Sequence, residues 1–378
     1  MVVPRLMRGI CVCIYRFNKR PADLRAFFVS DKKNFKGQKM KELIEKLYNK
    51  ENLSFDETKS IFKEIFAGKL DPIVFSSVLT AMKIKGYSSD ELGGAASAMI
   101  SAALPFNRNR DICVGEIVGT GGDKLKTINI STISAIVSAS LGLHVAKHGN
   151  TAVSSKSGAS DVLTELGYNI RAEEKDTLRA LEEQGFAFFF AQKYHTGMKY
   201  AAPVRKALGT STIFNILGPI CNPAHVDYEL LGCYDENLLE DMALALKLNN
   251  VKRAMVINGN GMDEISIFGQ TKVCELLENG ETKKYTLTNE DFGIKGNYTQ
   301  SDLTGGDAVE NAKTARQILS GKGCDAHNAV IAANTSAMLY LAGKADNFKS
   351  GFEMALEEIK SGRALNRFEN IAKISMGL

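Results

Sequence analysis

The chain of 378 residues is first characterised by what it lacks. It contains no run of 18 apolar residues, so the sequence predicts no membrane-spanning helix and no membrane partner. No Cys-x-x-Cys pair occurs among its seven cysteines, and its five histidines show no metal-ligand spacing beside them. These absences argue against a disulfide framework and a zinc site. They favour a reducing compartment, which we expect to be the cytoplasm.

Positive charge is concentrated at the N-terminus. Residues 1–39 hold ten basic and two acidic residues, a net charge of +8, whereas the whole chain carries +4, so residues 40–378 carry −4. A mildly acidic body does not favour nucleic acid as a partner. Residues 1–39 are Arg-rich like an organellar transit peptide but nearly lack serine. We interpret them as a basic extension without chemistry, either disordered or a mis-assigned start, with Met40 as the true start.

The rest of the chain changes pattern near residue 106. Residues 40–105 predict short helices, because Ser54 to Glu57 and Ser88 to Glu91 are capping boxes that precede apolar residues at helical spacing. Beyond residue 110, strands alternate with helices, which predicts a mostly parallel sheet. Strands are expected at 112–118, 143–147, 186–191, 228–234 and 253–258, helices at 130–141, 158–167, 174–184 and 237–248, a hairpin at 271–287, and further helices over 307–361. The predicted fold is therefore an α/β protein, with a small N-terminal helical domain (40–105) and a larger α/β domain (106–378) with a mostly parallel central sheet.

A glycine-rich stretch between a strand and a helix is the strongest functional signal. Gly119-Thr120-Gly121-Gly122-Asp123 precedes Asn129-Ile130-Ser131-Thr132. Glycines at such a turn leave backbone N–H groups free to bind phosphate oxygens, and nearby hydroxyls add donors. A dinucleotide fingerprint is excluded because Lys124 stands where the third glycine is required, and no P-loop spacing occurs. The stretch predicts phosphate binding in another setting, although Gly-Gly alone is also common in plain turns.

Four further groups carry possible chemistry. Lys147 to Asn150 follow a predicted strand and could bind an anion or be a plain surface loop. Ser154, Ser155 and Gly158 precede a helix and could bind an anion or be a plain helix cap. Asp263-Glu264 after a strand suits Mg²⁺, although exposed acidic pairs are common. Arg205 could bind a carboxylate with two hydrogen bonds, or be a solvated helix residue, and we expect Pro203 in the first turn of its helix. The segment 214–219 could line an aromatic pocket or belong to the core.

In this order, the motifs resemble those of the anthranilate phosphoribosyltransferase family over residues 40 to 360. The markers are Gly119 to Asp123, Asn129 to Thr132, Lys147 to Asn150, Ser154-Ser155 with Gly158, Met198-Lys199, Arg205, Thr212 to Pro219, Asn222-Pro223 and Asp263-Glu264. The resemblance implies a transferase of tryptophan biosynthesis that joins anthranilate to phosphoribosyl pyrophosphate and releases pyrophosphate. It also implies a homodimer formed through the helical domain, which helices from about 200–220 complete, and Mg²⁺ as cofactor, two ions per site.

The resemblance also assigns site residues. Those implied for phosphoribosyl pyrophosphate are Gly119, Thr120, Gly121, Gly122, Asp123, Thr127, Asn129, Ser131, Thr132, Lys147, Ser154, Ser155, Gly158 and Ala159. Those implied for anthranilate are Gly119, His148, Asn150, His195, Arg205 and Pro219. Those implied for the metal are Ser131, Asp263 and Glu264, and no residue is assigned as a catalytic acid or base. The order Ala159-Ser160 is exchanged relative to the family pattern, and Thr196-Gly197 replace its usual Pro-Ala after His195.

Two alternatives stay open at this point. A pyrimidine nucleoside phosphorylase would share the fold and a similar glycine loop, but its lysine-rich signature is not seen. A non-enzymatic paralogue that binds nucleic acid would be expected to lose the acidic pair and to carry a basic body. Asp263-Glu264 is present and residues 40–378 are acidic overall, so the transferase is the favoured interpretation.

Overall fold

The computed structural model describes residues 38–123, 125–151 and 157–378. It divides into a unit that ends at Glu51 and a second unit, Asn52–Leu378. In the first unit, residues 38–48 are helical, as the pattern after Met40 predicts. Ser154 and Ser155 lie outside the described residues, as do residues 1–37. No helix in the described part combines the length and the apolar character needed to cross a membrane.

The second unit begins with three helices, α3 (Phe55–Phe66), α4 (Pro72–Lys85) and α5 (Ser89–Ser101). Both predicted capping boxes are formed, since Ser54 accepts from the N–H of Glu57 and Ser88 accepts from that of Glu91. Each glutamate bonds back to the backbone of its serine, which satisfies two N–H groups that a helix start would otherwise leave unpaired. The capping boxes therefore fix where α3 and α5 begin.

Helices α3 and α5 pack closely because α5 presents a glycine to its neighbour. A Cβ at Gly94 would lie 2.3 Å from the carbonyl oxygen of Phe55 and 3.0 Å from Cβ of Thr58. Both distances are shorter than ordinary contact, so no side chain fits there without moving one helix. The close approach thus depends on the absence of a side chain at position 94.

We expect Gly94→Ala to destabilise the protein by about 2 kcal/mol, because overpacking forces the two helices apart. Chemical denaturation measures the change. Ser97→Ala on the same helix is the matched control, because Ser97 is only half-buried, and it should stay within about 0.5 kcal/mol of the parent. An unchanged midpoint for Gly94→Ala would show that the contact between α3 and α5 is not tight.

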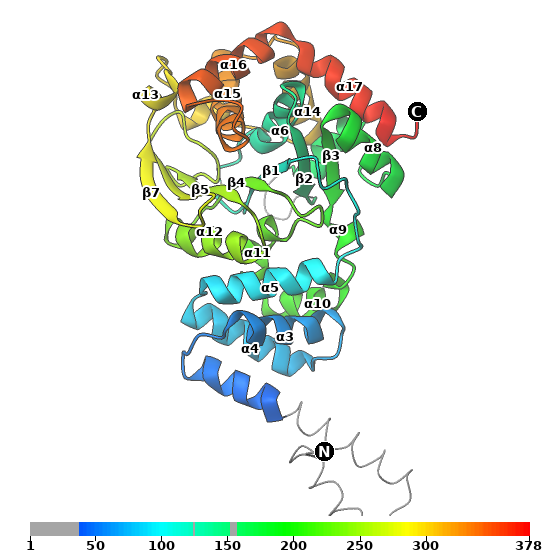
Figure 1. The fold of residues 1–378 in the computed structure, drawn as a ribbon, viewed down its shortest axis with the longest axis vertical. Coiled ribbons are helices and arrows are strands. Elements are labelled where there is room, and N and C mark those ends of the chain that lie inside the picture. The colour runs from blue at the N-terminus through cyan, green and yellow to red at the C-terminus, as the bar shows by residue number, and fades with distance from the viewer. Residues whose placement is uncertain (1–37, 124, 152–156) are drawn as a thin grey trace, which may run out of the picture. The chain divides into compact units, whose positions relative to one another are not determined.

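Past residue 110 the second unit is a layered α/β structure (Figure 1). Its sheet has seven strands in the described residues, in the order β3-β2-β1-β4-β5-β6-β7. They are β1 (Val114–Gly119), β2 (His144–Gly149), β3 (Phe186–Phe190), β4 (Tyr228–Gly232), β5 (Arg253–Gly259), β6 (Thr271–Leu276) and β7 (Thr282–Leu287). Strands β1 to β5 are parallel, and β6 and β7 form the predicted antiparallel hairpin. The predicted fold class, a helical part followed by an α/β part with a mostly parallel sheet, is confirmed.

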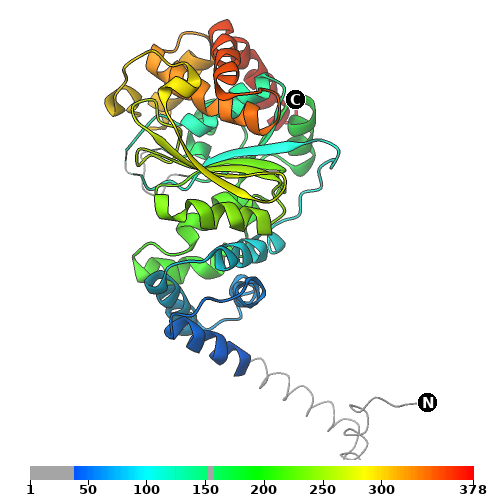
Figure 2. The same cartoon turned by 60° about the vertical axis from the view of Figure 1, so that its left-hand side comes forward.

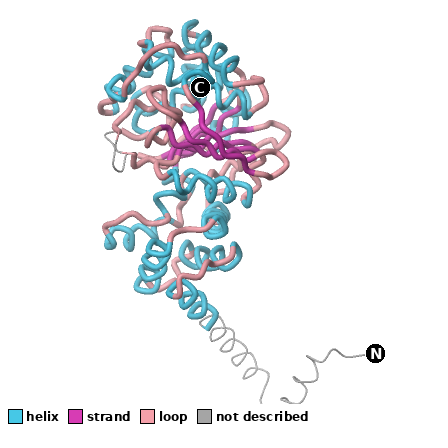
Figure 3. The backbone as a smooth tube through the Cα atoms, turned by 90° about the vertical axis from the view of Figure 1, so that its left-hand side faces the viewer, coloured by secondary structure: helices cyan, strands magenta, loops and turns pink. Residues whose placement is uncertain are grey.

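Helices cover both faces of the sheet (Figures 2 and 3). One face carries α6 (Ile130–Ser140), α8 (Glu174–Gln184) and the C-terminal helices α14 (Ala308–Leu319), α15 (Asp325–Leu341), α16 (Phe348–Ser361) and α17 (Arg363–Ser375). Helix α12 (Leu239–Leu248) packs on the opposite face and on α5, and the short α7 (Ala159–Glu165) packs on α14. Helix α17 lies beyond the range that the sequence pattern predicts as helical.

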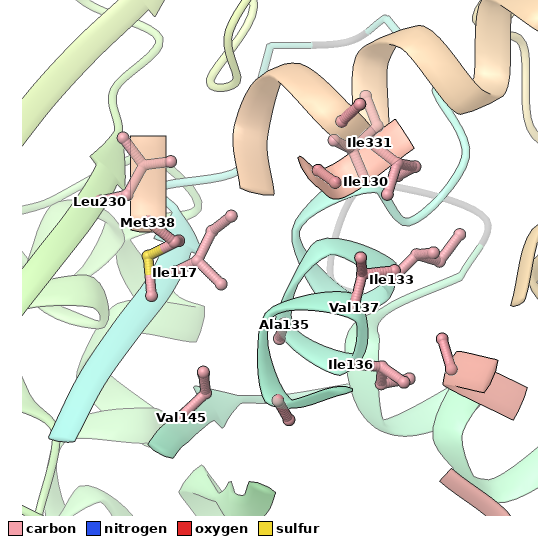
Figure 4. Close-up of a cluster of buried hydrophobic side chains, with 14 of the residues drawn as sticks. Ile117, Ile130, Ile133, Ala135, Ile136, Val137, Val145, Leu230, Ile331 and Met338 are labelled. Atoms are coloured by element: carbon pink, nitrogen blue, oxygen red, sulfur yellow. The ribbon is translucent and has the colours of Figure 1, made fainter. Parts of the chain in front are cut away.

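The main core lies between the sheet and α6 with α15 (Figure 4). Ile117 of β1 and Leu230 of β4 point toward this core together with Val145 of β2, and all three are buried. Successive residues of a strand face opposite sides of the sheet. The residues that precede Ile117 and Leu230, which are Glu116 and Glu229, therefore face the other way. Two acidic residues thus lie on the face toward α5.

Mid-chain helices pack against the first helices of this unit. Helix α10 (Met198–Leu208) contacts α3 and α4, and Phe214 of α11 (Phe214–Leu217) lies 5.8 Å from the ring of Phe62 and 6.1 Å from that of Phe75. The expectation for Pro203 was wrong, because α10 begins five residues earlier and holds this proline in its interior. Pro203 and Lys199 are exposed, so the carbonyl of Lys199, which loses its helical partner, can bond to water. The domain boundaries at 40 and 105 stay predictions.

Candidate active site

The glycine-rich stretch leaves β1 and is anchored at its second residue. The N–H of Thr120 donates to the carbonyl of Gly232 (2.8 Å), and its hydroxyl accepts from the N–H of Tyr234 (3.2 Å). Gly121 and Gly122 follow at φ +66° and +86°, a left-handed conformation that residues with a side chain rarely adopt. Both glycines are exposed. The sequence thus forms an open backbone turn at the carboxyl end of the sheet, where ligands bind in such folds.

The acidic pair that follows β5 reaches this turn. Asp263 Oδ2 accepts from the N–H of Gly121 at 2.6 Å. A Cβ at Gly119 would lie 2.2 Å from the same Oδ2, so only glycine fits beside the carboxylate. Glu264 points to the start of α6, where its Oε1 accepts from the N–H of Ser131 at 3.1 Å. The two loops that the sequence predicts as phosphate and metal binding therefore lie against each other.

Lys147 is the cation of this cluster. Its Nζ donates to the hydroxyl of Ser131 (3.1 Å) and to the carbonyl of Ile117 (2.8 Å), and its side chain is 1% exposed. Burial lowers the pKa of Lys147, and the nearby carboxyls of Glu116, Glu264 and Asp263 raise it. The pKa of Lys147 is lowered overall, and among the described residues Lys147 is the basic group whose Nζ lies beside Ser131 and the acidic pair.

Among the described residues, Lys147 alone does not neutralise the acidic side chains of this cluster, which are Asp123, Asp263 and Glu264. Burial, followed by the charge of Asp123, raises the pKa of Asp263 to about 7. Burial, followed by the charge of Asp263, raises the pKa of Glu264 well above its usual range. Repelling carboxyl groups that are taken out of water favour their protonated forms unless a further cation joins them. The cluster is therefore short of positive charge.

The other residues predicted for phosphoribosyl pyrophosphate surround the start of α6. Asn129 precedes this helix, and its Oδ1 accepts from Asn311 Nδ2 of α14 at 2.8 Å. Thr127 forms a bridge with Thr304, whereas the hydroxyl of Thr132 is buried and has no partner among the described residues. Gly158 and Ala159 start α7, and the N–H of Gly158 is occupied by Asp161 (2.8 Å). The hydroxyl of Ser160 is buried, so the exchange with Ala159 places it in the interior.

The predicted acceptor residues form a second group around His148. Its Nδ1 lies 3.0 Å from the carbonyl oxygen of Gly218, just before Pro219, and its ring meets that of His195 edge-on at 5.0 Å. The Sγ atom of Cys221 lies 3.9 Å from Nε2 of His195. Because a carbonyl only accepts, Nδ1 of His148 carries the proton and its Nε2 is left as an acceptor. Burial lowers the pKa of His148 to about 4 and that of His195 to about 3, so both rings are neutral at pH 7.

The two remaining residues predicted for the acceptor, Asn150 and Arg205, make contacts outside this group. The exposed Asn150 accepts from Gln192 Nε2 at 3.1 Å. Arg205 of α10 is half-buried and stacks over the ring of Phe214 at 5.3 Å. This contact joins Arg205 to the helix that leads into Gly218 and Pro219. The structure therefore brings His148, His195 and Pro219 together, whereas Arg205 contacts Phe214.

Comparison with known proteins decides the family. Residues 113–365 match the model of the glycosyl transferase family a/b domain, and residues 41–103 match that of its helical bundle domain. Anthranilate phosphoribosyltransferase of Psychromonas ingrahamii is 47% identical over 334 residues, which cover 88% of this chain and 97% of that protein. The chain belongs to the anthranilate phosphoribosyltransferase family.

Solved structures agree with this family assignment. The crystal structure of anthranilate phosphoribosyltransferase from Thermus thermophilus superposes with a TM-score of 0.83 at 36% identity, over 88% of this chain and 99% of that one. The Saccharomyces cerevisiae enzyme superposes at 0.80 and 28% identity, over 90% and 98% of the two chains. It has been solved in complex with phosphoribosyl pyrophosphate and Mg, and also with 4-fluoroanthranilate.

The residues of this family member fit a hard divalent cation. Asp263, Glu264 and the hydroxyl of Ser131 offer oxygen ligands, which Mg²⁺ prefers. Burial raises the pKa of both carboxyl groups, and the charges of neighbouring carboxyls raise it further, so a bound cation there would favour their ionised forms. The donor set and the electrostatics therefore agree with a magnesium site.

Sequence reasoning missed Glu116 in this family member, whose carboxyl contacts the backbone of His148 in the candidate site. Glu116 and Glu229 are both buried, on neighbouring strands, and they are register partners. The only available signal was a charged residue inside each apolar run. The register of the strands decides which buried groups these two carboxyls contact, and the motifs carry no information about register.

Proposed function

We propose that this chain transfers the 5-phosphoribosyl group from phosphoribosyl pyrophosphate to anthranilate, giving N-(5-phosphoribosyl)anthranilate and pyrophosphate. The observation that carries the proposal is the contact of the glycine turn with the acidic pair, through Gly121 and Asp263 at 2.6 Å. A site built this way can hold a polyphosphate leaving group between backbone N–H groups and a metal-binding carboxylate. Membership in the anthranilate phosphoribosyltransferase family supports the choice of substrates.

The first step of the chemistry is binding of the leaving group. We infer that the backbone of Gly119 to Asp123, with the hydroxyls of Thr120, Thr127 and Thr132 and the amide of Asn129, binds the phosphates. Lys147 lies under the same turn and adds positive charge. Ser154, Ser155, Gly158 and Ala159 belong to this set by resemblance. Oriented N–H groups stabilise charge without having to reorganise during the reaction, which is the main requirement for a departing pyrophosphate.

We propose that Asp263, Glu264 and Ser131 hold Mg²⁺, two ions per site. Bound there, Mg²⁺ would neutralise the charge that develops on the leaving pyrophosphate. The chain's own contribution is to keep the carboxylates buried and aligned through the N–H groups of Gly121 and Ser131. Among the described residues, one lysine, Lys147, opposes the three acidic groups Asp123, Asp263 and Glu264, which supports more than one cation.

The second step concerns the acceptor. The amine nitrogen of anthranilate forms a bond to C1 of the ribose while the C1–O bond to pyrophosphate breaks, and the amine then loses one proton. We infer that His148, His195, Asn150 and Pro219 shape the acceptor site, with Gly119 at its boundary, and that Arg205 binds the carboxylate. The neutral His148 ring offers Nε2 as an acceptor for an amine N–H. An arylamine is uncharged at pH 7, so no strong base is required.

The assembly and compartment follow as further proposals. We propose a homodimer formed through the helical part, which is supported by the exposed side chains of Ile73 and Ile84 on α4. We propose the cytoplasm as the compartment. Cys113, Cys221, Cys233, Cys274 and Cys324 are free in the described part of the chain, as expected in a reducing environment.

We expect the purified protein to consume anthranilate when both phosphoribosyl pyrophosphate and Mg²⁺ are present. Loss of anthranilate fluorescence follows the reaction, and mass spectrometry identifies the product. Anthranilate should not be consumed without phosphoribosyl pyrophosphate, which donates the transferred group. It should not be consumed without Mg²⁺ either, because the leaving pyrophosphate needs its countercharge. Phosphorolysis of a pyrimidine nucleoside without any consumption of anthranilate would overturn the proposed function.

A further inference from the structure

The recorded register pairs between β1 and β2 end before the candidate site, and two side chains connect the strands beyond them. The two strands pair at Val114 with His144 and at Gly115 with Val145. Beyond these pairs, Lys147 Nζ donates to the carbonyl of Ile117, and Glu116 Oε1 accepts from the N–H of His148 at 2.7 Å. Lys147 belongs to the phosphate side of the proposed site. Glu116, which has no role in the proposed reaction, takes the equivalent position on the acceptor side.

The second oxygen of Glu116 binds the loop that follows η1 (Pro219–Cys221). Its Oε2 accepts from Nδ2 of Asn222 at 2.7 Å. The same Nδ2 donates to the carbonyl of Ala146 (2.7 Å), and Oδ1 of Asn222 accepts from the N–H of Ala224 (2.9 Å). The side-chain amide of Asn222 is therefore held in one orientation, in which its Nδ2 group, a donor, faces Glu116.

His148 is consequently held at both ends. Glu116 fixes its backbone, and the carbonyl of Gly218 fixes its ring at Nδ1 (3.0 Å). Gly218 belongs to the same segment that Asn222 ties back to Glu116. We propose that Glu116 is a positioning residue for the acceptor site, because its two carboxyl oxygens hold the backbone of His148 and the loop of Asn222 in fixed places relative to each other. This inference rests on the proposed function.

The neighbouring Glu229 shows that burial alone does not create this role. It is the register partner of Glu116 and is equally buried, but its Oε1 has no partner among the described residues. Burial raises the pKa of Glu229 well above its usual range, and the charge of Glu116 raises it further. Burial raises the pKa of Glu116 to about 8, whereas the donors of Asn222 and His148 and the charge of Lys147 lower it. An ionised Glu116 satisfies two donors, which a neutral group cannot.

The test is Glu116→Gln, assayed at pH 8.5 in the full-length protein with Mg²⁺. The glutamine keeps the shape, but its amide nitrogen must face one of two donors. The KM for anthranilate should rise about tenfold or more, whereas the KM for phosphoribosyl pyrophosphate should stay within about twofold. Glu229→Gln is the matched control, and both constants should stay within about twofold because Oε1 of Glu229 has no partner among the described residues.

A second variant approaches the contact from its other end. Asn222→Ala should give the same selective rise in the KM for anthranilate, and it tests the proposal if Glu116→Gln does not fold. Combining the two changes should be no worse than the more damaging single change, because both break one connection. Wild-type kinetics for anthranilate in both single variants, or an equal rise for both substrates, would overturn the positioning role. So would a Glu229→Gln variant as impaired as Glu116→Gln.

Fluorescence titration with anthranilate separates this inference from the proposed function. A wild-type protein that binds anthranilate but does not convert it would refute the proposed reaction, and the dissociation constants of the variants would still test Glu116. Weaker binding by Glu116→Gln, with Glu229→Gln unchanged, supports the positioning role. A wild-type protein that neither binds nor converts anthranilate would refute both.

Discussion

Replacing Asp263 by Asn together with Glu264 by Gln should lower kcat/KM for phosphoribosyl pyrophosphate by roughly a thousandfold, because the leaving pyrophosphate loses its metal countercharge. The amides keep an oxygen that can accept from the N–H groups of Gly121 and Ser131, so the backbone contacts are retained. What changes is the charge. The Mg²⁺ concentration required for half-maximal activity should rise as well, and steady-state assays at a series of Mg²⁺ concentrations measure it.

The stability of this double variant distinguishes lost metal binding from lost folding. Burial raises the pKa of both carboxyl groups, so their ionised forms oppose folding, and this cost grows as the pH rises through the folded-state pKa. The neutral amides should therefore leave the melting temperature at pH 8 unchanged or higher. Glu236→Gln, which removes an exposed carboxylate paired with Lys272, is the control and should be fully active. An unaltered Mg²⁺ profile in the double variant would exclude this pair from the metal site.

Gly119→Ala should lower kcat/KM for phosphoribosyl pyrophosphate by roughly a hundredfold. The new methyl group would lie 2.2 Å from Oδ2 of Asp263, so either the carboxylate or the turn must move. A displacement of about 1 Å in such a site costs about that factor in rate. Steady-state kinetics measure the change, and calorimetric titration with the magnesium complex of phosphoribosyl pyrophosphate shows whether binding is lost.

Gly121→Ala is the comparison that isolates the clash. This glycine has φ +66°, but a Cβ there would meet no atom within 4 Å. Its substitution costs only the backbone strain of about 1 kcal/mol, so we expect a loss of tenfold or less. If Gly121→Ala were as damaging as Gly119→Ala, backbone conformation would matter more than the space beside Asp263. Wild-type kinetics for Gly119→Ala would contradict the close packing of the two loops.

The two halves of the candidate site lie on opposite sides of one strand end. Lys147 points toward Ser131 on α6 and serves the phosphate side, whereas the next residue, His148, points toward Gly218 and serves the acceptor side. Adjacent residues of a strand face opposite sides of a sheet. In the proposed function, two consecutive residues of β2 would therefore face different substrates.

Much of this arrangement is predictable from the sequence because its signals are local. Capping boxes at Ser54 and Ser88 place helix starts within a few residues, and short apolar runs that alternate with helical patterns place β1 to β5. Gly119 to Asp123 and Asp263-Glu264 stand out because they occur together and in the order of the family's motifs, although each alone is common in plain turns and exposed loops. Helix α17 and the position of Pro203 inside α10 are harder to predict from the sequence, because tertiary packing overrides weak local preferences there.

The sequence by itself determined the order of the elements, the fold class and the individual motifs, because each depends on residues close together in the chain. Only the tertiary structure decided that Gly121 meets Asp263 across 142 positions and that Glu116 meets Asn222 across 106. The burial of Glu116 beside Glu229 likewise follows from the register of β1 and β4. Such contacts arise from strand order and pairing, and their energy depends on burial. Both are properties of the whole sheet, and no short stretch of sequence contains them.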